Sequence, residues 1–95
     1  MQSLSHAVPG AIAELLRGTP LSPGKVQFAW TVAVGPAMQR ATAVKLVDDG
    51  RLLVDAVDAQ WAREVRRSTR VILPRLRALL GDGVVTVVEV RAPRR

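Results

Sequence analysis

Five arginines in the segment 59–80 are the side chains of this sequence best suited to binding chemistry. As a helix, that segment would carry them within about 100° of arc, and the set is Arg63, Arg66, Arg67, Arg70 and Arg77. Guanidinium groups match phosphate geometry, and like charges on one face repel unless a polyanion neutralises them. The only acid after the start of this helix is Glu64. The pattern predicts nonspecific contact with a nucleic-acid backbone, since no Asn or Gln is interleaved to read bases.

The net charge is concentrated in the same part of the chain. The 14 Lys and Arg residues exceed the 8 Asp and Glu residues, which gives a formal charge of +6. Residues 1–58 hold equal numbers of bases and acids, so the whole excess lies in residues 59–95. A one-sided basic surface attracts polyanions, although the same surface also serves solubility.

Residues for catalysis or for binding a metal or cofactor are scarce. The chain has no cysteine, which excludes a disulfide, a thiolate zinc site and a cysteine nucleophile. The one histidine, His6, is expected to be a solvated surface group, and Asp48 and Asp49 occupy a turn where Asp is favoured for backbone reasons. The run Gly81–Gly83 is too short for a phosphate loop and follows a helix. We therefore predict no enzyme, no metal, no cofactor and no small-molecule substrate.

Length and hydropathy predict one folded domain in the cytoplasm. Ninety-five residues suffice for a single hydrophobic core, and 48% of them are hydrophobic. No signal peptide is visible, and no apolar run approaches the roughly 18 residues that a membrane span needs.

Two helices are predicted before the first strand. Residues 3–17 show helical spacing, and Gly18 and Pro20 end that helix. The pair Ser22-Pro23 then opens a second helix, with Ser as N-cap and Pro at the first helical position. A kink is expected near Gly35. The predicted buried stripe consists of Val26, Trp30, Ala33, Val34, Ala37 and Ala41.

Three aromatic residues divide between core and surface. Trp30 and Trp61 are expected in the core. Phe28 and Val32 lie off the buried stripe of the second helix, which leaves two alternatives open. Either the first helix covers them, or they form an exposed apolar patch that binds a partner.

The rest of the chain predicts a hairpin, a long helix and a last strand. Runs of period two flank Asp49-Gly50, which predicts a two-residue type I′ turn with both residues at positive φ. Asp58 is placed to cap a helix that Pro74 should divide or kink. Six of the eight residues 84–91 are β-branched, which predicts a strand with Val84, Thr86, Val88 and Val90 on one face. The predicted fold is α+β in the order α-α-β-β-α(α)-β.

The set of motifs resembles the DciA family of bacterial proteins, which assist loading or operation of the replicative DNA helicase. The resemblance covers residues 23–91 and rests on Leu46 together with WTVAVG at 30–35, AT at 41–42, DGRLLV at 49–54, AQWA at 59–62 and VR at 90–91. It implies a small domain like a type II KH domain, with helices on one face of a three-stranded sheet. The implied division is an N-terminal helix and connection in residues 1–22, the KH-like domain in 23–91 and a basic tail in 92–95.

The resemblance also implies function. It implies DNA binding, contact with the replicative helicase and no ATPase activity. An RNA-binding KH domain carries a Gly-x-x-Gly loop between paired helices, whereas this chain has VILPR at 71–75. The chain also has almost none of the long extension found in many family members.

The leading hypothesis is therefore a DNA-associated adaptor for the replicative helicase. The arginine face would bind DNA, single-stranded or without sequence preference, and Phe28 with Val32 would bind the helicase. Two alternatives remain open: a KH-like RNA-binding protein, and a pure protein-interaction or dimerisation module whose basic charge serves an acidic partner.

Overall fold

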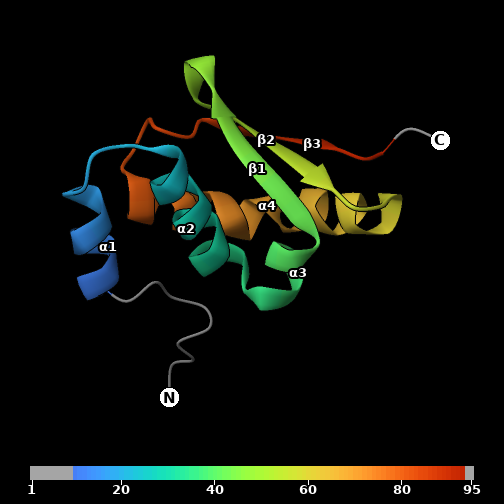
Figure 1. Ribbon diagram of the computed structural model, residues 1–95, viewed down its shortest axis with the longest axis horizontal. Helices are drawn as coiled ribbons and strands as arrows, with labels where there is room; N and C mark the ends of the chain where they lie inside the picture. Colours follow the sequence, from blue (N-terminus) through green and yellow to red (C-terminus); the bar gives the residue numbers. More distant parts are fainter. Residues whose placement is uncertain (1–9, 94–95) are drawn as a thin grey trace.

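The computed structural model describes residues 10–93, and its elements follow the predicted order (Figure 1). The elements are α1 (Gly10–Arg17), α2 (Pro23–Val34), α3 (Pro36–Arg40), β1 (Thr42–Val47), the 3₁₀ turn η2 (Asp48–Gly50), β2 (Arg51–Ala56), α4 (Ala59–Leu80) and β3 (Val87–Arg91). The α+β class is confirmed. Residues 3–9 of the predicted first helix, with His6, lie outside the described residues.

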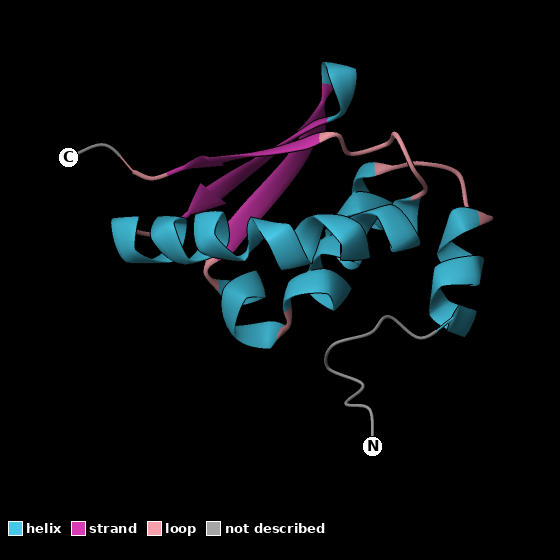
Figure 2. Ribbon diagram, turned by 180° about the vertical axis from the view of Figure 1, so that it is seen from behind, coloured by secondary structure: helices cyan, strands magenta, loops and turns pink. Residues whose placement is uncertain are grey.

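The sheet is mixed and has helices on one face. Its strand order is β1-β2-β3, with β1 antiparallel to β2 and β2 parallel to β3. A parallel pair needs a long crossover connection, and α4 supplies it. Figure 2 shows the helices gathered on one side of the sheet, so the opposite sheet face stays uncovered by them.

The second helix begins as predicted and ends sooner. Ser22 Oγ accepts a hydrogen bond from the Lys25 backbone N–H at 3.1 Å, as an N-cap should. Gly35, at φ 85°, ends α2, and Pro36 then starts α3, so the expected kink is a break into two helices. After the break at Gly35 the chain changes direction, so α3 does not continue the predicted buried stripe of α2. For that reason Ala37 is exposed and Val34 only partly buried, while Val26, Trp30, Ala33 and Ala41 are buried.

The hairpin turn has the predicted backbone conformation but is one residue longer. Asp49 and Gly50 have φ of 68° and 75°. Val47 pairs with Arg51, which leaves three residues in the connection, so the two-residue turn is wrong. The wider loop is held by Thr86, whose backbone N–H donates to the Gly50 carbonyl at 2.8 Å and whose hydroxyl donates to that of Asp49 at 3.0 Å.

The long helix is continuous. Asp58 Oδ1 accepts from the Trp61 backbone N–H at 2.8 Å, which confirms the predicted cap. The helix runs through Pro74 as one element, so division, one of the two effects expected of Pro74, does not occur. A proline deletes one helical hydrogen bond, but Ile72 and Leu76 on either side of it are 3% and 1% exposed. Their burial holds the two halves in one helix.

The first helix packs against the long one. Ala13 and Leu16 of α1 are buried, and Arg17 Nη1 donates to the Ala78 carbonyl of α4 at 2.6 Å. The last strand begins at Val87, later than predicted, because Thr86 is engaged by the hairpin turn and is exposed. Val85, the residue before it, is buried instead.

The two tryptophans differ in burial. Trp30 is 0% exposed at the centre of the core. Its indole N–H donates to the Thr42 hydroxyl at 2.9 Å, which in turn donates to the Met38 carbonyl at 2.7 Å. Trp61 is only partly buried and packs at the margin of the core cluster. The prediction of a core position is thus confirmed for Trp30 and only half met for Trp61.

Candidate nucleic-acid interface

A straight row of arginines runs along the outer side of α4. Arg63, Arg70 and Arg77 are exposed and follow each other at intervals of seven residues. Seven residues are close to two turns, so consecutive members lie almost in line and about 10.5 Å apart along the axis. Among the described residues none of the three side chains has a hydrogen-bond or ion-pair partner. We call these three residues the arginine row.

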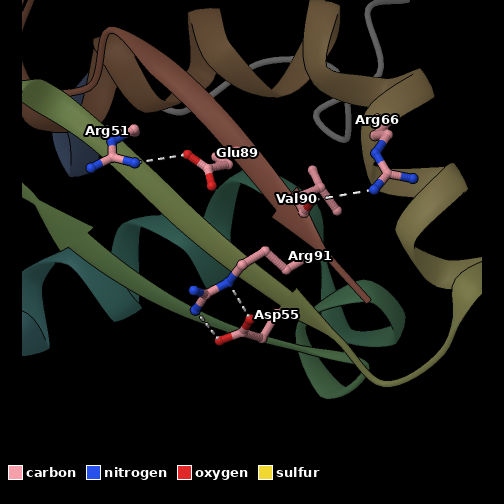
Figure 3. A network of polar contacts seen from close by, with 6 residues as sticks. All are labelled: Arg51, Asp55, Arg66, Glu89, Val90 and Arg91. Carbon is pink, nitrogen blue, oxygen red and sulfur yellow. Dashed lines mark hydrogen bonds and ion pairs between the residues drawn. The ribbon is translucent and has the colours of Figure 1, made fainter. Parts of the chain in front are cut away.

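The other two arginines of the predicted face are exposed but engaged. Arg66 Nη2 donates to the Val90 carbonyl of β3 at 3.2 Å (Figure 3). Arg67 forms an ion pair with Glu64 one turn earlier. An exposed pair of this kind stabilises the fold by about 0–1 kcal/mol, so a stronger anion can displace it. The structure therefore brings all five arginines to one face of α4, and two of them already have a partner within the fold.

Three further bases bind backbone carbonyls within the fold. Arg75 Nη1 of α4 donates to the Ala33 carbonyl of α2 at 2.8 Å. Lys25 is 8% exposed, and its Nζ donates to the Thr19 carbonyl at 2.6 Å. Arg17 acts in the same way on α4. These bases satisfy carbonyls at or near helix ends, which lack partners inside the helix, so net charge overstates the positive charge that is free to bind.

The uncovered face of the sheet pairs its arginines with acids. Arg91 contacts both carboxylate oxygens of Asp55, at 2.8 and 2.9 Å, and Arg51 Nη1 contacts Glu89 Oε1 at 3.0 Å (Figure 3). The hydrogen bonding of Arg91 to the Asp55 carboxylate, followed by the negative charge of that carboxylate, raises the pKa of Arg91. This face is consequently close to neutral.

The apolar pair of the second helix is partly exposed. Phe28 is 49% exposed, and Val32 is partly buried against the core. The first helix lies on α4 and leaves Phe28 in contact with solvent. A separate surface hollow, which the sequence did not indicate, is lined by Val34, Ala37, Met38, Gln60, Trp61 and Glu64. Its side chains come from α2, α3 and α4.

Two other kinds of feature are absent from residues 10–93. That range contains no cluster of three His, Cys, Asp or Glu side chains able to hold a metal ion. It also contains no helix long and apolar enough to cross a membrane.

These features define a small α+β domain with a mixed sheet, in which three arginines without a partner among the described residues form a row along one helix. The family model described as "Dna[CI] antecedent, DciA" matches residues 3–90. The chain belongs to the DciA family.

The curated relatives of this chain are described as UPF0232 proteins. The chain is 32% identical over 88 residues to a UPF0232 protein of Rhodococcus jostii (strain RHA1), which covers 92% of this chain and 47% of the relative. It is 30% identical over 70 residues to a UPF0232 protein of Mycolicibacterium smegmatis, covering 74% of this chain and 36% of that protein. The chain thus spans less than half the length of these relatives.

Proposed function

We propose that this protein is a DNA-associated adaptor that assists loading or operation of the replicative DNA helicase and performs no catalysis itself. Membership in the DciA family supports a role related to helicase loading. The arginine row is the observation that carries the DNA-binding half of the proposal, because its charges have no partner among the described residues.

DNA binding follows from the spacing of the row. From Arg63 to Arg77 the row spans about 21 Å, long enough to follow several phosphates of one strand. Each guanidinium replaces condensed counterions, which makes the affinity depend on salt and not on sequence. Arg66 and Arg67 flank the row and add contacts when their internal partners are displaced.

Helicase contact is assigned to Phe28 with Val32 on α2. A half-exposed aromatic beside an apolar neighbour fits the centre of a protein interface, where buried aromatic residues carry most of the binding energy. Phe28→Ser should weaken helicase binding by about 2 kcal/mol and leave the melting temperature nearly unchanged, since the side chain is 49% exposed. Leu15→Ser is the control, because Leu15 is 72% exposed on α1.

A matched pair of charge reversals tests DNA binding. Arg70→Glu and Arg40→Glu make the same change of charge at exposed positions without a partner among the described residues. Fluorescence anisotropy with a single-stranded oligonucleotide should show a loss of about tenfold or more for the first variant and little for the second. Equal losses would mean that only total charge matters.

The same titrations separate the alternatives. A preference for structured RNA over single-stranded DNA would favour a KH-like RNA-binding protein, although α4 is continuous through residues 71–75, where such a domain has a loop. Absence of nucleic-acid binding at low salt would favour a pure interaction or dimerisation module. Failure to associate with the replicative helicase of the same organism, with and without DNA, would refute the adaptor role.

A further inference from the structure

The two edge strands of the sheet, β1 and β3, differ in the contacts along their outer edges. At the β3 edge, Arg66 of α4 donates to the Val90 carbonyl, and Pro93 follows the strand. At the β1 edge, the only backbone hydrogen bonds that Thr42–Val47 makes with other described residues are those of the β2 ladder. An uncovered edge of this length is a template on which another strand can pair.

A groove runs beside the uncovered edge. It has a volume of about 400 Å³ and is lined by Leu21, Ser22, Pro23, Val26, Val44, Lys45 and Leu46. Most of these side chains are apolar, and Leu21 at its wall is 52% exposed. The lining contains no acid, and its single charge is Lys45, which is exposed and has no partner among the described residues.

We propose that β1 and this groove bind an extended segment of a partner protein, apolar at every second residue and acidic at an intervening one, as a fourth strand. Successive side chains of a strand point to opposite faces. An added strand on β1 would therefore place its apolar residues in the groove and its acid beside Lys45, as a cross-strand ion pair. Main-chain bonds supply affinity in this mode of recognition, and the groove supplies specificity.

The charge pattern disfavours two other occupants. Pairing with β1 of a second copy would bring two Lys45 side chains together on the same face, and like charges so placed destabilise a sheet. A nucleic-acid strand would meet apolar walls and one lysine, whereas the arginine row lies on α4. The proposal does not depend on the adaptor function, because it concerns other residues.

A synthetic peptide tests the proposal on the full chain. The probe is Ac-VEVEVEV-NH2, and the comparison peptide has the same composition with its three Glu residues adjacent. Backbone amide NMR should show saturable shifts at Thr42–Val47 and at the groove residues Leu21 and Val26. The comparison peptide should bind about tenfold more weakly.

Substitutions locate the contact. Leu21→Asp should weaken binding about tenfold, whereas Leu15→Asp, at an exposed leucine of α1, should not. Lys45→Glu should reverse the preference toward a peptide that alternates Val with Lys. The titration is repeated with R63Q/R70Q, because Glu could bind those arginines, and the shifts at β1 should persist there.

Several outcomes would overturn the proposal. NMR shifts confined to α4, equal binding of the two peptides, or no binding at millimolar peptide would each contradict it. Shifts at β1 caused by an oligonucleotide would instead indicate nucleic acid as the occupant. Self-association through β1, measured by sedimentation, would indicate a second copy of the chain. If the wild-type protein binds neither helicase nor DNA but still binds the peptide at β1, the adaptor function is refuted and the strand-binding proposal is not.

Discussion

Arginines occur on both α4 and the uncovered face of the sheet, but the two surfaces use them differently. On the sheet, Arg51 and Arg91 each meet a carboxylate on the neighbouring strand. On the helix, the arginine row meets none among the described residues. Adjacent strands lie about 5 Å apart, so an arginine on one strand reaches a carboxylate on the next. The members of the arginine row are about twice as far from one another along α4, and no carboxylate among the described residues reaches them. Position in the fold, and not the number of arginines, decides which charge is free.

The largest expected effect tests whether Trp30, at the centre of the core, contributes more to stability than Trp61, which packs at the edge of the core. Trp30→Ala should lower the free energy of unfolding by about 3–5 kcal/mol, as for a fully buried aromatic, because it also removes the hydrogen bond to Thr42. Trp61→Ala should cost clearly less, since Trp61 is partly buried. Chemical denaturation measures both. Equal losses would place Trp61 in the structural core.

The next effect concerns DNA. R63Q/R70Q on the helix and R51Q/R91Q on the sheet remove the same charge. The helix variant should lose about thirtyfold in affinity for single-stranded DNA, about 2 kcal/mol, and the log–log salt slope should become shallower by about 1.4. The sheet variant should stay near wild type in both. A similar loss in the sheet variant would break the comparison.

A smaller effect tests how tightly the turn between β1 and β2 is packed. Gly50→Val should destabilise the fold by about 1.5 kcal/mol, because a β-branched residue is strained at positive φ. A Cβ there would also lie 3.0 Å from Thr86 Oγ1 and 3.1 Å from the Val84 carbonyl oxygen. Gly81→Val is the control: it shares the positive φ, at 99°, but its Cβ would meet nothing within 4 Å. Thermal melting should rank Gly50→Val as the more damaging change.

The smallest effect sharpens the comparison within α4. Glu64→Gln releases Arg67 from its ion pair and should strengthen DNA binding by about twofold, within the 0–1 kcal/mol of an exposed pair. Glu89→Gln releases Arg51 on the sheet and should leave DNA affinity unchanged. Anisotropy titrations of the two variants, side by side, provide the measurement. An equal gain in both would show that free charge anywhere on the surface suffices.

Local signals predicted most of the fold. The caps Ser22 and Asp58, the positive φ of Asp49 and Gly50, and the arc of arginines follow from residues close in sequence, and the structure confirms them.

Contacts between distant residues account for what the sequence did not predict. Arg75 reaches the Ala33 carbonyl across 42 residues, and Arg66 reaches that of Val90 across 24, so no local pattern shows that they are engaged. Thr86 widens a hairpin turn that lies more than 30 residues earlier. In each case a backbone carbonyl finds its donor only through the tertiary fold.

The parallel pairing of β2 with β3 imposes an order on folding. The β1–β2 hairpin closes over a short loop, but β3 cannot pair until the whole of α4 has been made. Contacts between distant residues form slowly, since the loop entropy is lost before they are gained. During synthesis the sheet therefore stays two-stranded until the last described residues leave the ribosome. Arg66 gains its carbonyl partner only when β3 is in place, so the state of the α4 surface depends on completion of the sheet.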